Sequence, residues 1–592
     1  MSYRDNIFGQ LFDPEARLAL HQSRLQGVQH LAQRIPMDVL PGQMVTLRVT
    51  TSGILPFDQV CGWYRTEPGL EALTRLDFQP EEVTWDNALG AYVRHWSANL
   101  PGQPEGTMVR YQVGARVAGT QEWVYADNQA RTQEEATRFS FWCTGQSLPA
   151  WTRDVVVYHI FMDRFYPGDG KPWQKPESLS GFFGGTLRGV IQKLDYIREM
   201  GFTAIWLSPI FPSPSHHGYD ATDYFSIEPR YGTLADFQEL VQQAHARGIR
   251  IILDFVANHC SHLHLAFQDA QAHQNSPYHD WFTWLDWPED YATYFGVREL
   301  PQLNLKPGPA RDYLLSSARF WFEQGVDGFR LDYAYGPSHD FWMDFRRACR
   351  QANPECWLFG EVIHTPEQQL SYTGEMDGTL DFLLCRALRE TFGHGNWPLS
   401  RFEAFLSEHE TYFPETFSRP AFLDNHDMNR ILFIANGDTA RVKLAALALF
   451  TLSGPPIVYN GTETGVSQER QIHQNDFGIF EEARLPMKWG PGQDASLRDY
   501  FTRLIHLRRQ HPLLHNSPRR LLHLDGQTLA YAREASGVCV VAVFNISADP
   551  CRVVLPGLPE MQDVLNGCQV SLTREGLCVE LPGRTGAFLT AL

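Results

Sequence analysis

The chain has 592 residues, of which 43% are hydrophobic and 20% are charged. This composition is that of a folded, water-soluble protein, and the length exceeds what one hydrophobic core organises, so we expect two to four domains. A formal net charge of −18 without a long basic run argues against nucleic acid and anionic membranes as partners and favours a neutral substrate.

The first 148 residues predict a helix followed by a β-sandwich. Residues 14–34 are rich in Gln and Leu and are predicted to be helical. From about residue 37 to 143, short alternating segments separated by Gly and Pro turns are typical of paired β-sheets. Examples are residues 44–50, 91–96 and 108–113. The first residues lack a basic stretch followed by an apolar run, so no secretory signal is expected. We assign residues 1–148 to an N-terminal extension and β-sandwich domain.

Residues 149–515 predict a barrel of alternating strands and helices. Helical patterns such as residues 234–247, which end at Gly248, separate eight short apolar runs. The predicted strands are residues 155–161, 204–211, 250–256, 328–331, 356–362, 378–382, 420–423 and 456–459. Eight strands that alternate with helices indicate an α/β fold of the (β/α)8 TIM-barrel type.

One interval of this barrel is too long for a single strand–helix unit. Asp254 and Asp332 are 332 − 254 = 78 residues apart, whereas one unit needs about 30 residues. We assign the excess, at about residues 258–309, to a subdomain inserted after strand 3. From residue 516 to 592 short strands return, for example at 538–544 and 551–555, and they predict a C-terminal β-sandwich domain.

Three acidic residues follow predicted strands at spacings that strand–helix units produce. Asp332 and Glu361 are 29 residues apart, about one unit, and Glu361 and Asp427 are 66 apart, about two units. Because the C-terminal ends of barrel strands meet around one mouth, we expect these carboxylates to converge there. Arg330 lies on the same strand face as Asp332, where it can keep that carboxylate ionised. The alternative, three unrelated ion-pair partners at strand ends, explains the matched spacing less well.

Paired carboxyl groups on neighbouring strands suit the cleavage of a glycosidic bond. One group protonates the leaving oxygen, while the other attacks the anomeric carbon or activates water from the opposite face. Adjacent strands lie about 4.8 Å apart, which favours the separation of roughly 5–5.5 Å found in retaining enzymes. Proximity to Asp332 is expected to raise the pKa of Glu361, as a general acid requires.

Four motifs in this chain resemble the four sequence regions of the α-amylase family, glycoside hydrolase family 13. The motifs are residues 254–259, 328–332, 360–361 and 425–427, and the match runs in order through about residues 155–515. The resemblance implies a retaining O-glycosyl hydrolase in which Asp332 is the nucleophile and Glu361 the acid/base. It implies that Asp427 stabilises the transition state.

The same resemblance implies the residues that bind the substrate. Arg330, His259 and His426 are expected to line the subsite at the cleaved bond. Tyr219, in a motif similar to the one that follows the family's second strand, is expected to be the platform on which a sugar ring stacks. No metal ligand is assigned. The Trp and Tyr residues of the insert either pack internally or stack on sugars.

Further features resemble the neopullulanase/cyclomaltodextrinase/maltogenic amylase group within that family. They are the N-terminal sandwich and residues 163–165, 183–185 and 300–304. This resemblance implies an intracellular enzyme that cleaves α-glucosidic bonds in maltodextrins or cyclic malto-oligosaccharides by double displacement. It also implies a homodimer in which the N-terminal domain of one chain covers the active site of the other.

Two other functions remain open at this point. After Asp332 the chain has Tyr335 and Gly336 at positions where the group usually has an Asn-Glu pair and many amylases have Lys-His. Because these positions contact the acceptor side in the family, an α-glucan transglycosylase or isomerase that uses the same covalent intermediate is the alternative. A catalytically silent carbohydrate-binding protein is a distant alternative, since such relatives lack the catalytic acids that this chain has.

No cofactor is expected. The family's calcium loop has Pro167 and Thr186 in place of an Asn and an acid, and only Asp169 remains as an obvious ligand, whereas calcium needs several oxygens. Asn258 leaves a second calcium position open.

A zinc site is a further alternative, and it concerns four clustered residues: His259, Cys260, His262 and His264. It is disfavoured because His259 belongs to the substrate motif and no second Cys/His pair has ligand spacing. The ten cysteines are scattered without paired spacing, which indicates reduced thiols and a cytoplasmic location.

Overall fold

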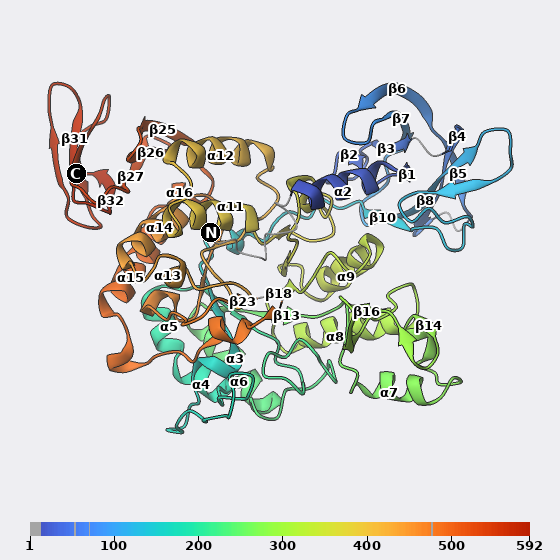
Figure 1. The fold of residues 1–592 in the computed structure, drawn as a ribbon, viewed down its shortest axis with the longest axis horizontal. Helices are drawn as coiled ribbons and strands as arrows, with labels where there is room; N and C mark the ends of the chain where they lie inside the picture. The colour runs from blue at the N-terminus through green and yellow to red at the C-terminus, as the bar shows by residue number, and fades with distance from the viewer. Residues whose placement is uncertain (1–13, 53–54, 70–71, 475–476) are drawn as a thin grey trace.

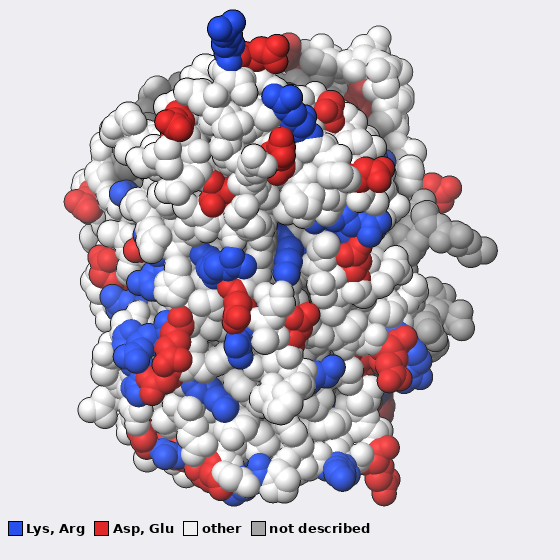
Figure 2. Space-filling model, turned by 90° about the vertical axis from the view of Figure 1, so that its left-hand side faces the viewer, with Lys and Arg blue, Asp and Glu red and all other residues white. Residues whose placement is uncertain are grey.

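The computed structural model describes residues 14–52, 55–69, 72–474 and 477–592. A central barrel lies between two all-β regions, the N-terminal one in blue and the C-terminal one in red (Figure 1). None of the helices in the described ranges combines the length and the apolarity that a membrane crossing needs. On the face shown in Figure 2, acidic and basic side chains are interspersed.

The eight predicted barrel strands are confirmed. They are β11 (Val157–Ile160), β12 (Ala204–Leu207), β13 (Arg250–Phe255), β18 (Gly328–Leu331), β19 (Trp357–Gly360), β20 (Gly378–Thr379), β21 (Ala421–Phe422) and β22 (Pro456–Tyr459). Neighbours in chain order pair in parallel from β11 to β20 and again from β21 to β22, and β22 pairs with β11. A bridge between Gly378 and Ser418 joins β20 to the segment before β21 and closes the ring. The barrel is therefore continuous, and the C-terminal ends of its strands share one mouth.

The barrel strands are buried on both faces. Trp206, Ile252, Trp357 and Phe359 fill the interior, so the barrel is a packed core and not a pore. Helices cover the outside. The main ones are α4 (Leu187–Gln192), α5 (Leu194–Met200), α6 (Leu234–Ala246), α8 (Pro309–Glu323), α9 (His339–Ala352), α11 (Phe382–Leu388), α12 (Leu399–Tyr412), α14 (Thr439–Thr451) and α15 (Ala495–Gln510).

Helix α6 shows how these covering helices are specified. Thr233 and Asp236 form a capping box at its first turn, which satisfies backbone N–H groups that have no partner within the helix. Phe237, Leu240 and Ala244 are buried, at the three- and four-residue spacing that places side chains on one face. The predicted helix at residues 234–247 is confirmed.

The N-terminal region forms two five-stranded antiparallel sheets. One contains β1 (Gly27–Gln29), β2 (Arg34–Ile35), β3 (Val45–Ser52), β6 (Gln79–Asp86) and β7 (Ala91–Leu100). The other contains β4 (Phe57–Glu67), β5 (Thr74–Asp77), β8 (Met108–Val117), β9 (Trp123–Tyr125) and β10 (Phe139–Trp142). The strands predicted from the alternating segments are present.

The predicted helix at residues 14–34 is only half right. Helix α2 (Pro14–Leu25) ends before Gly27, whose φ of 72° favours glycine. The chain then enters the sheet as β1 and β2. Val28 is fully buried in the sandwich, whereas α2 buries no residue, so pairing with a distant strand outweighs the local helix preference. The first 13 residues of the predicted N-terminal extension lie outside the described residues.

The N-terminal sandwich is fixed to the barrel through helix α9. Met343 of α9 belongs to the hydrophobic core of the sandwich. Arg110 of β8 bonds to Asp340 and Asp344 of α9, with both distances 2.6 Å, and Arg311 of α8 bonds to the same two carboxylates. Because both acids are buried and each bonds to two arginines, these bonds fix how the sandwich is oriented on the barrel.

The inserted subdomain after β13 contains one helix and two short hairpins. The helix is α7 (Leu265–Ala272), and the hairpins are β14 (Trp284–Asp286) with β15 (Asp290–Tyr291) and β16 (Thr293–Tyr294) with β17 (Val297–Pro301). Trp281 and Trp284 pack against other rings of the chain, and Trp287 donates to the carbonyl of Ala270. These three tryptophans are therefore internal packing residues of the insert.

The C-terminal region forms a sandwich of five and three strands. The larger sheet contains β25 (Arg519–Leu524), β26 (Thr528–Ala535), β27 (Val538–Asn545), β29 (Met561–Asp563) and β32 (Thr585–Ala591). The smaller contains β28 (Cys551–Leu555), β30 (Gln569–Leu572) and β31 (Leu577–Leu581). The strands predicted at residues 538–544 and 551–555 are β27 and β28.

Candidate active site

Two of the predicted acidic residues are neighbours across a pair of parallel strands. Leu331 at the end of β18 pairs with Gly360 at the end of β19. The next residues, Asp332 and Glu361, therefore leave their strands side by side at the mouth, at about the 4.8 Å spacing of adjacent strands. Each is anchored by a backbone N–H that donates to the preceding strand: Asp332 to Phe255 and Glu361 to Leu331.

A single guanidinium group holds these acids together. Arg330 is fully buried. Its Nη1 donates to Oδ1 of Asp332 and to Oδ1 of Asp254, both at 2.8 Å, and its Nη2 lies 2.7 Å from Oε1 of Glu361. Asp254 also accepts from the indole of Trp206. Three carboxyl groups around one cation fix the positions of both neighbouring acids.

The third predicted acid has cationic neighbours of its own. Asp427 lies 2.9 Å from Nε2 of His426 and accepts from Nη2 of Arg484 at 2.8 Å. Burial raises the pKa of Asp427, but the charges of His426 and Arg484 outweigh burial and lower this pKa below its usual value. This carboxylate is therefore ionised at neutral pH. Arg484 was missed in the sequence because it ends a short 3-10 helix after β22 (Phe480–Arg484) and belongs to no recognised motif.

The remaining predicted residues complete one network. The hydroxyl of Tyr219 donates to Oδ2 of Asp254 at 3.0 Å and lies 2.7 Å from Nε2 of His426. The rings of Tyr219 and His426 are stacked, with centroids 5.3 Å apart. Nε2 of His259 donates to the backbone carbonyl of Tyr219 at 3.1 Å. The structure therefore brings all seven predicted site residues together.

The electrostatics of the neighbouring pair favour a shared proton. Burial raises the pKa of Glu361 to about 7 and that of Asp332 to about 7, while the charge of Arg330 opposes this shift in both. The negative charge of Asp332 further raises the pKa of Glu361. Because the two groups interact, they titrate as a pair. Near neutral pH the pair can hold one proton, leaving one carboxylate and one carboxylic acid.

Aromatic residues of the insert reach this site, which the sequence left undecided. The ring of Tyr294 lies 4.6 Å from that of His259 and 4.9 Å from that of Tyr333. Burial, followed by the charges of the three acids, raises the pKa of Tyr294. Phe295, next in the chain, is 68% exposed and contacts Tyr333.

Two acids in the region that resembles the family's calcium loop already have hydrogen-bond partners. The carboxylate of Asp163 accepts from the backbone N–H groups of Phe183 and Gly184, and that of Asp169 accepts from Gln192. Within the described ranges, no group of three or more His, Cys, Asp and Glu side chains is arranged to hold a metal ion.

The histidine cluster considered for zinc is used otherwise. His264 accepts from the N–H of Ala266 at the start of α7, and Nδ1 of His262 lies 3.3 Å from the carbonyl of Glu299. The three histidines therefore have separate hydrogen-bond partners, and that of His259 is Tyr219. The geometry gives no support to the zinc alternative.

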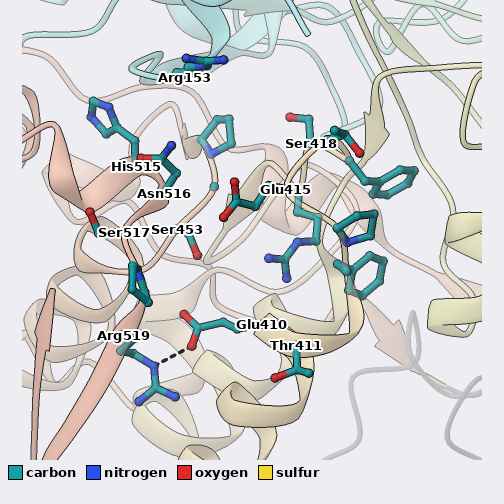
Figure 3. Close-up of a pocket in the computed structure, with 18 of the residues that line it drawn as sticks. Arg153, Glu410, Thr411, Glu415, Ser418, Ser453, His515, Asn516, Ser517 and Arg519 are labelled. Carbon is teal, nitrogen blue, oxygen red and sulfur yellow. Dashed lines mark hydrogen bonds and ion pairs between the residues drawn. The ribbon is translucent and has the colours of Figure 1, made fainter. Parts of the chain in front are cut away.

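Figure 3 shows a cavity of about 830 Å³. Its lining residues place it at the end of the barrel opposite the three acids. Residues that precede strands line it, among them Arg153 before β11, Arg419 before β21 and Ser453 before β22. Of the glutamates that line it, Glu410 is paired with Arg519 of β25. Because residues at the N-terminal face of a barrel serve stability more often than chemistry, this cavity is not the site that the three acids form.

Comparison with known proteins agrees with this geometry. The model of the alpha amylase catalytic domain matches residues 159–505. The α-amylase 2 of Dictyoglomus thermophilum is 33% identical over 548 residues, which cover 92% of this chain and 93% of that protein. A cyclomaltodextrinase of Thermoanaerobacter pseudethanolicus is 34% identical over 435 residues, or 70% and 74% of the two chains. A solved cyclomaltodextrinase structure matches with a TM-score of 0.70 at 26% identity, covering 95% of this chain and 99% of that one.

Proposed function

The chain belongs to the α-amylase family of glycoside hydrolases, and from this premise we propose that it hydrolyses α-glucosidic bonds in maltodextrins or cyclic malto-oligosaccharides with retention of configuration. One observation carries the proposal. Asp332 and Glu361 leave paired strands side by side and share the guanidinium of Arg330. Two carboxyl groups at this spacing are what a double displacement requires.

The proposed mechanism assigns each acid a role. Glu361, in its protonated form, gives its proton to the leaving oxygen while the Asp332 carboxylate attacks the anomeric carbon. Glu361, now ionised, then takes a proton from water, whose oxygen displaces Asp332 and releases an α-configured product. We assign Asp427, held ionised by Arg484, to the stabilisation of the oxocarbenium-like transition state. Arg330, Tyr219, His259 and His426 are proposed to bind the sugar at the cleaved bond.

We expect a bell-shaped pH dependence of kcat/KM with its alkaline limb near pH 7. Glu361 must be protonated to act as an acid, and burial raises its pKa to about 7. Above that pH the protonated fraction falls about tenfold per pH unit, and the rate falls with it. At low pH both members of the pair are protonated and Asp332 cannot attack. Initial rates on maltohexaose across the pH range measure both limbs, and a rate that stays level well above pH 7 would contradict the assignment of Glu361.

Product analysis tests the substrate class. We expect fast cleavage of β-cyclodextrin or pullulan, with little attack on starch, when these and maltohexaose and panose are incubated in parallel and the products are separated by chromatography. Strong cleavage of starch would indicate an open cleft and remove the assignment to the cyclomaltodextrinase-like group. Longer or rearranged oligosaccharides without net hydrolysis would favour the alternative, a transglycosylase or isomerase.

We further propose the setting in which the enzyme acts. All ten cysteines are free thiols in the structure, which supports a cytoplasmic location.

Domain limits at 148/149 and 515/516 remain our proposal, and limited proteolysis would cut near them. A homodimer through the N-terminal domain is proposed from the family resemblance, and sedimentation at a monomer mass across micromolar concentrations would refute it.

The proposed mechanism uses no cofactor. We therefore expect the enzyme to keep full activity after dialysis against EDTA.

A further inference from the structure

Two aromatic residues with left-handed backbones lie side by side at the mouth of the site. Phe295 has φ 48° and Tyr333 has φ 39°, and their ring centroids are 5.2 Å apart. Bulky side chains rarely adopt this region, and such conformations cluster at functional sites, where the surrounding structure holds them. The backbone gives no reason for an aromatic residue at either position, so the rings themselves need an explanation.

Phe295 stands where a turn favours another residue. Tyr294 pairs with Val297, so Phe295 and Gly296 form the two-residue turn of the hairpin, both with positive φ. Turns of this type prefer Asn or Gly at the first position. Phe295 is nevertheless 68% exposed, and its ring is in contact with Tyr294 and Tyr333. An exposed apolar ring in a strained turn at the edge of a site is suited to contact a ligand.

Tyr333 contacts the residue that is proposed as the acid. Its backbone N–H donates to Oε2 of Glu361 at 3.1 Å, and Glu361 is the group proposed to protonate the leaving oxygen. The Tyr219 platform lies instead with Asp254 and His426. Tyr333 and the ring of Phe295 beside it therefore extend the site from the acid outward, in the direction of the departing sugar.

Gly336 makes room for this arrangement. A Cβ atom at Gly336 would lie 2.1 Å from Oδ1 of Asn258 and 2.7 Å from a ring carbon of Tyr333. Asn258 is buried and packs beside His259, so it has little room to withdraw. Any side chain at position 336 would therefore displace the ring of Tyr333. With glycine at position 336, the ring of Tyr333 lies in the space that a polar side chain at this position would need.

We propose that Phe295 and Tyr333 form the surface that binds the leaving group, and that they recognise the apolar face of a glucose ring, or a flat apolar group in its place, by ring contact. Tyr335, which is 39% exposed and packs on His364 with centroids 4.1 Å apart, continues this surface. The inference rests on the proposed function and adds to it the residues that select the leaving group.

Asparagine substitutions test the contribution of each ring without disturbing the backbone conformation. Asn tolerates the left-handed region, so F295N and Y333N remove a ring while suiting the local φ, and Y333N keeps the N–H that contacts Glu361. The probes are benzyl α-maltoside and methyl α-maltoside, whose leaving alcohols have similar basicity. We expect the unmodified enzyme to prefer the benzyl compound in kcat/KM. In each variant this preference should fall about five- to tenfold, mainly through KM, with Tm unchanged or raised.

Two further variants serve as controls. F295Y keeps a ring at the turn and should keep the preference for the benzyl compound. Y412N removes an exposed tyrosine at the end of α12, away from the three acids, and should leave the preference unchanged. A benzyl preference that is the same in F295N, Y333N and the unmodified enzyme, with hydrolysis intact, would overturn this inference alone. Absence of hydrolysis of both maltosides and of maltohexaose by the unmodified enzyme would overturn the proposed function as well.

Discussion

Replacement of Asp332 by asparagine is expected to lower kcat on maltohexaose by about 10⁴-fold or more, a loss typical of removing a catalytic nucleophile, while the protein still folds. The amide has nearly the same shape and can still accept from Arg330, but it cannot form the covalent bond to the anomeric carbon. The loss of the negative charge at Asp332 also removes one cause of the raised pKa of Glu361. Initial rates of sugar release and thermal unfolding measure the two properties separately.

Asp327 provides a matched control for this experiment. It precedes β18 at the opposite end of the same strand, where its carboxylate is buried and bonds to Arg250, His245 and the N–H of Ile251. D327N should lower stability by about 1–3 kcal/mol, because buried donors lose their charged partner, and should leave kcat nearly unchanged. A D332N enzyme with activity within tenfold of the unmodified protein would contradict the mechanism.

Replacement of Glu361 by glutamine is expected to produce a loss that depends on the leaving group. With maltohexaose, whose leaving oxygen must be protonated, the rate should fall by about 10³-fold, within the usual range for general acid catalysis. With α-maltosyl fluoride the first step needs no proton, so fluoride should be released in a rapid burst. Turnover after the burst should remain slow because no base activates water, and added azide, which needs no base, should restore it.

Glu463 is the control for a buried glutamate without a chemical role. Its carboxylate accepts from the hydroxyl groups of Tyr158 and Tyr196 and from the N–H of Gly461. E463Q should reduce thermal stability and leave the ratio of the rates on fluoride and maltohexaose unchanged. If E361Q slowed the two substrates equally, Glu361 would not be the acid.

The barrel and its acids could be predicted because local pattern and position coincide there. Each barrel strand is a short apolar run buried on both faces, and Asp332 and Glu361 follow such runs directly. The end of a strand fixes where the next side chain lies, so spacing along the chain translated into proximity. Arg484 and Phe295 could not be found in this way, because they lie in a short 3-10 helix and in a hairpin turn whose positions depend on tertiary packing.

The error at residues 26–34 has the same physical origin. The composition of this segment is compatible with a helix, but Val28 and Arg34 are buried and pair with β3. Sheet pairing depends on a partner strand elsewhere in the chain, which local propensity does not register. The insert shows the converse: its tryptophans and Tyr294 have similar local sequence character, and only the fold separates packing residues from those at the site.

The charge of the site has a consequence for how ligands arrive. Four carboxyl groups surround the bond-cleaving position, and near neutral pH two of them share one proton. Arg330 and Arg484 offset two of the remaining three negative charges, so the mouth of the barrel keeps a negative potential. A neutral glucan feels no long-range force from it, and its association rate should be insensitive to ionic strength. A sugar mimic with a protonated amine would be drawn inward, more strongly at low salt, whereas a sulfated glucan would be repelled before it reached the aromatic residues at the mouth.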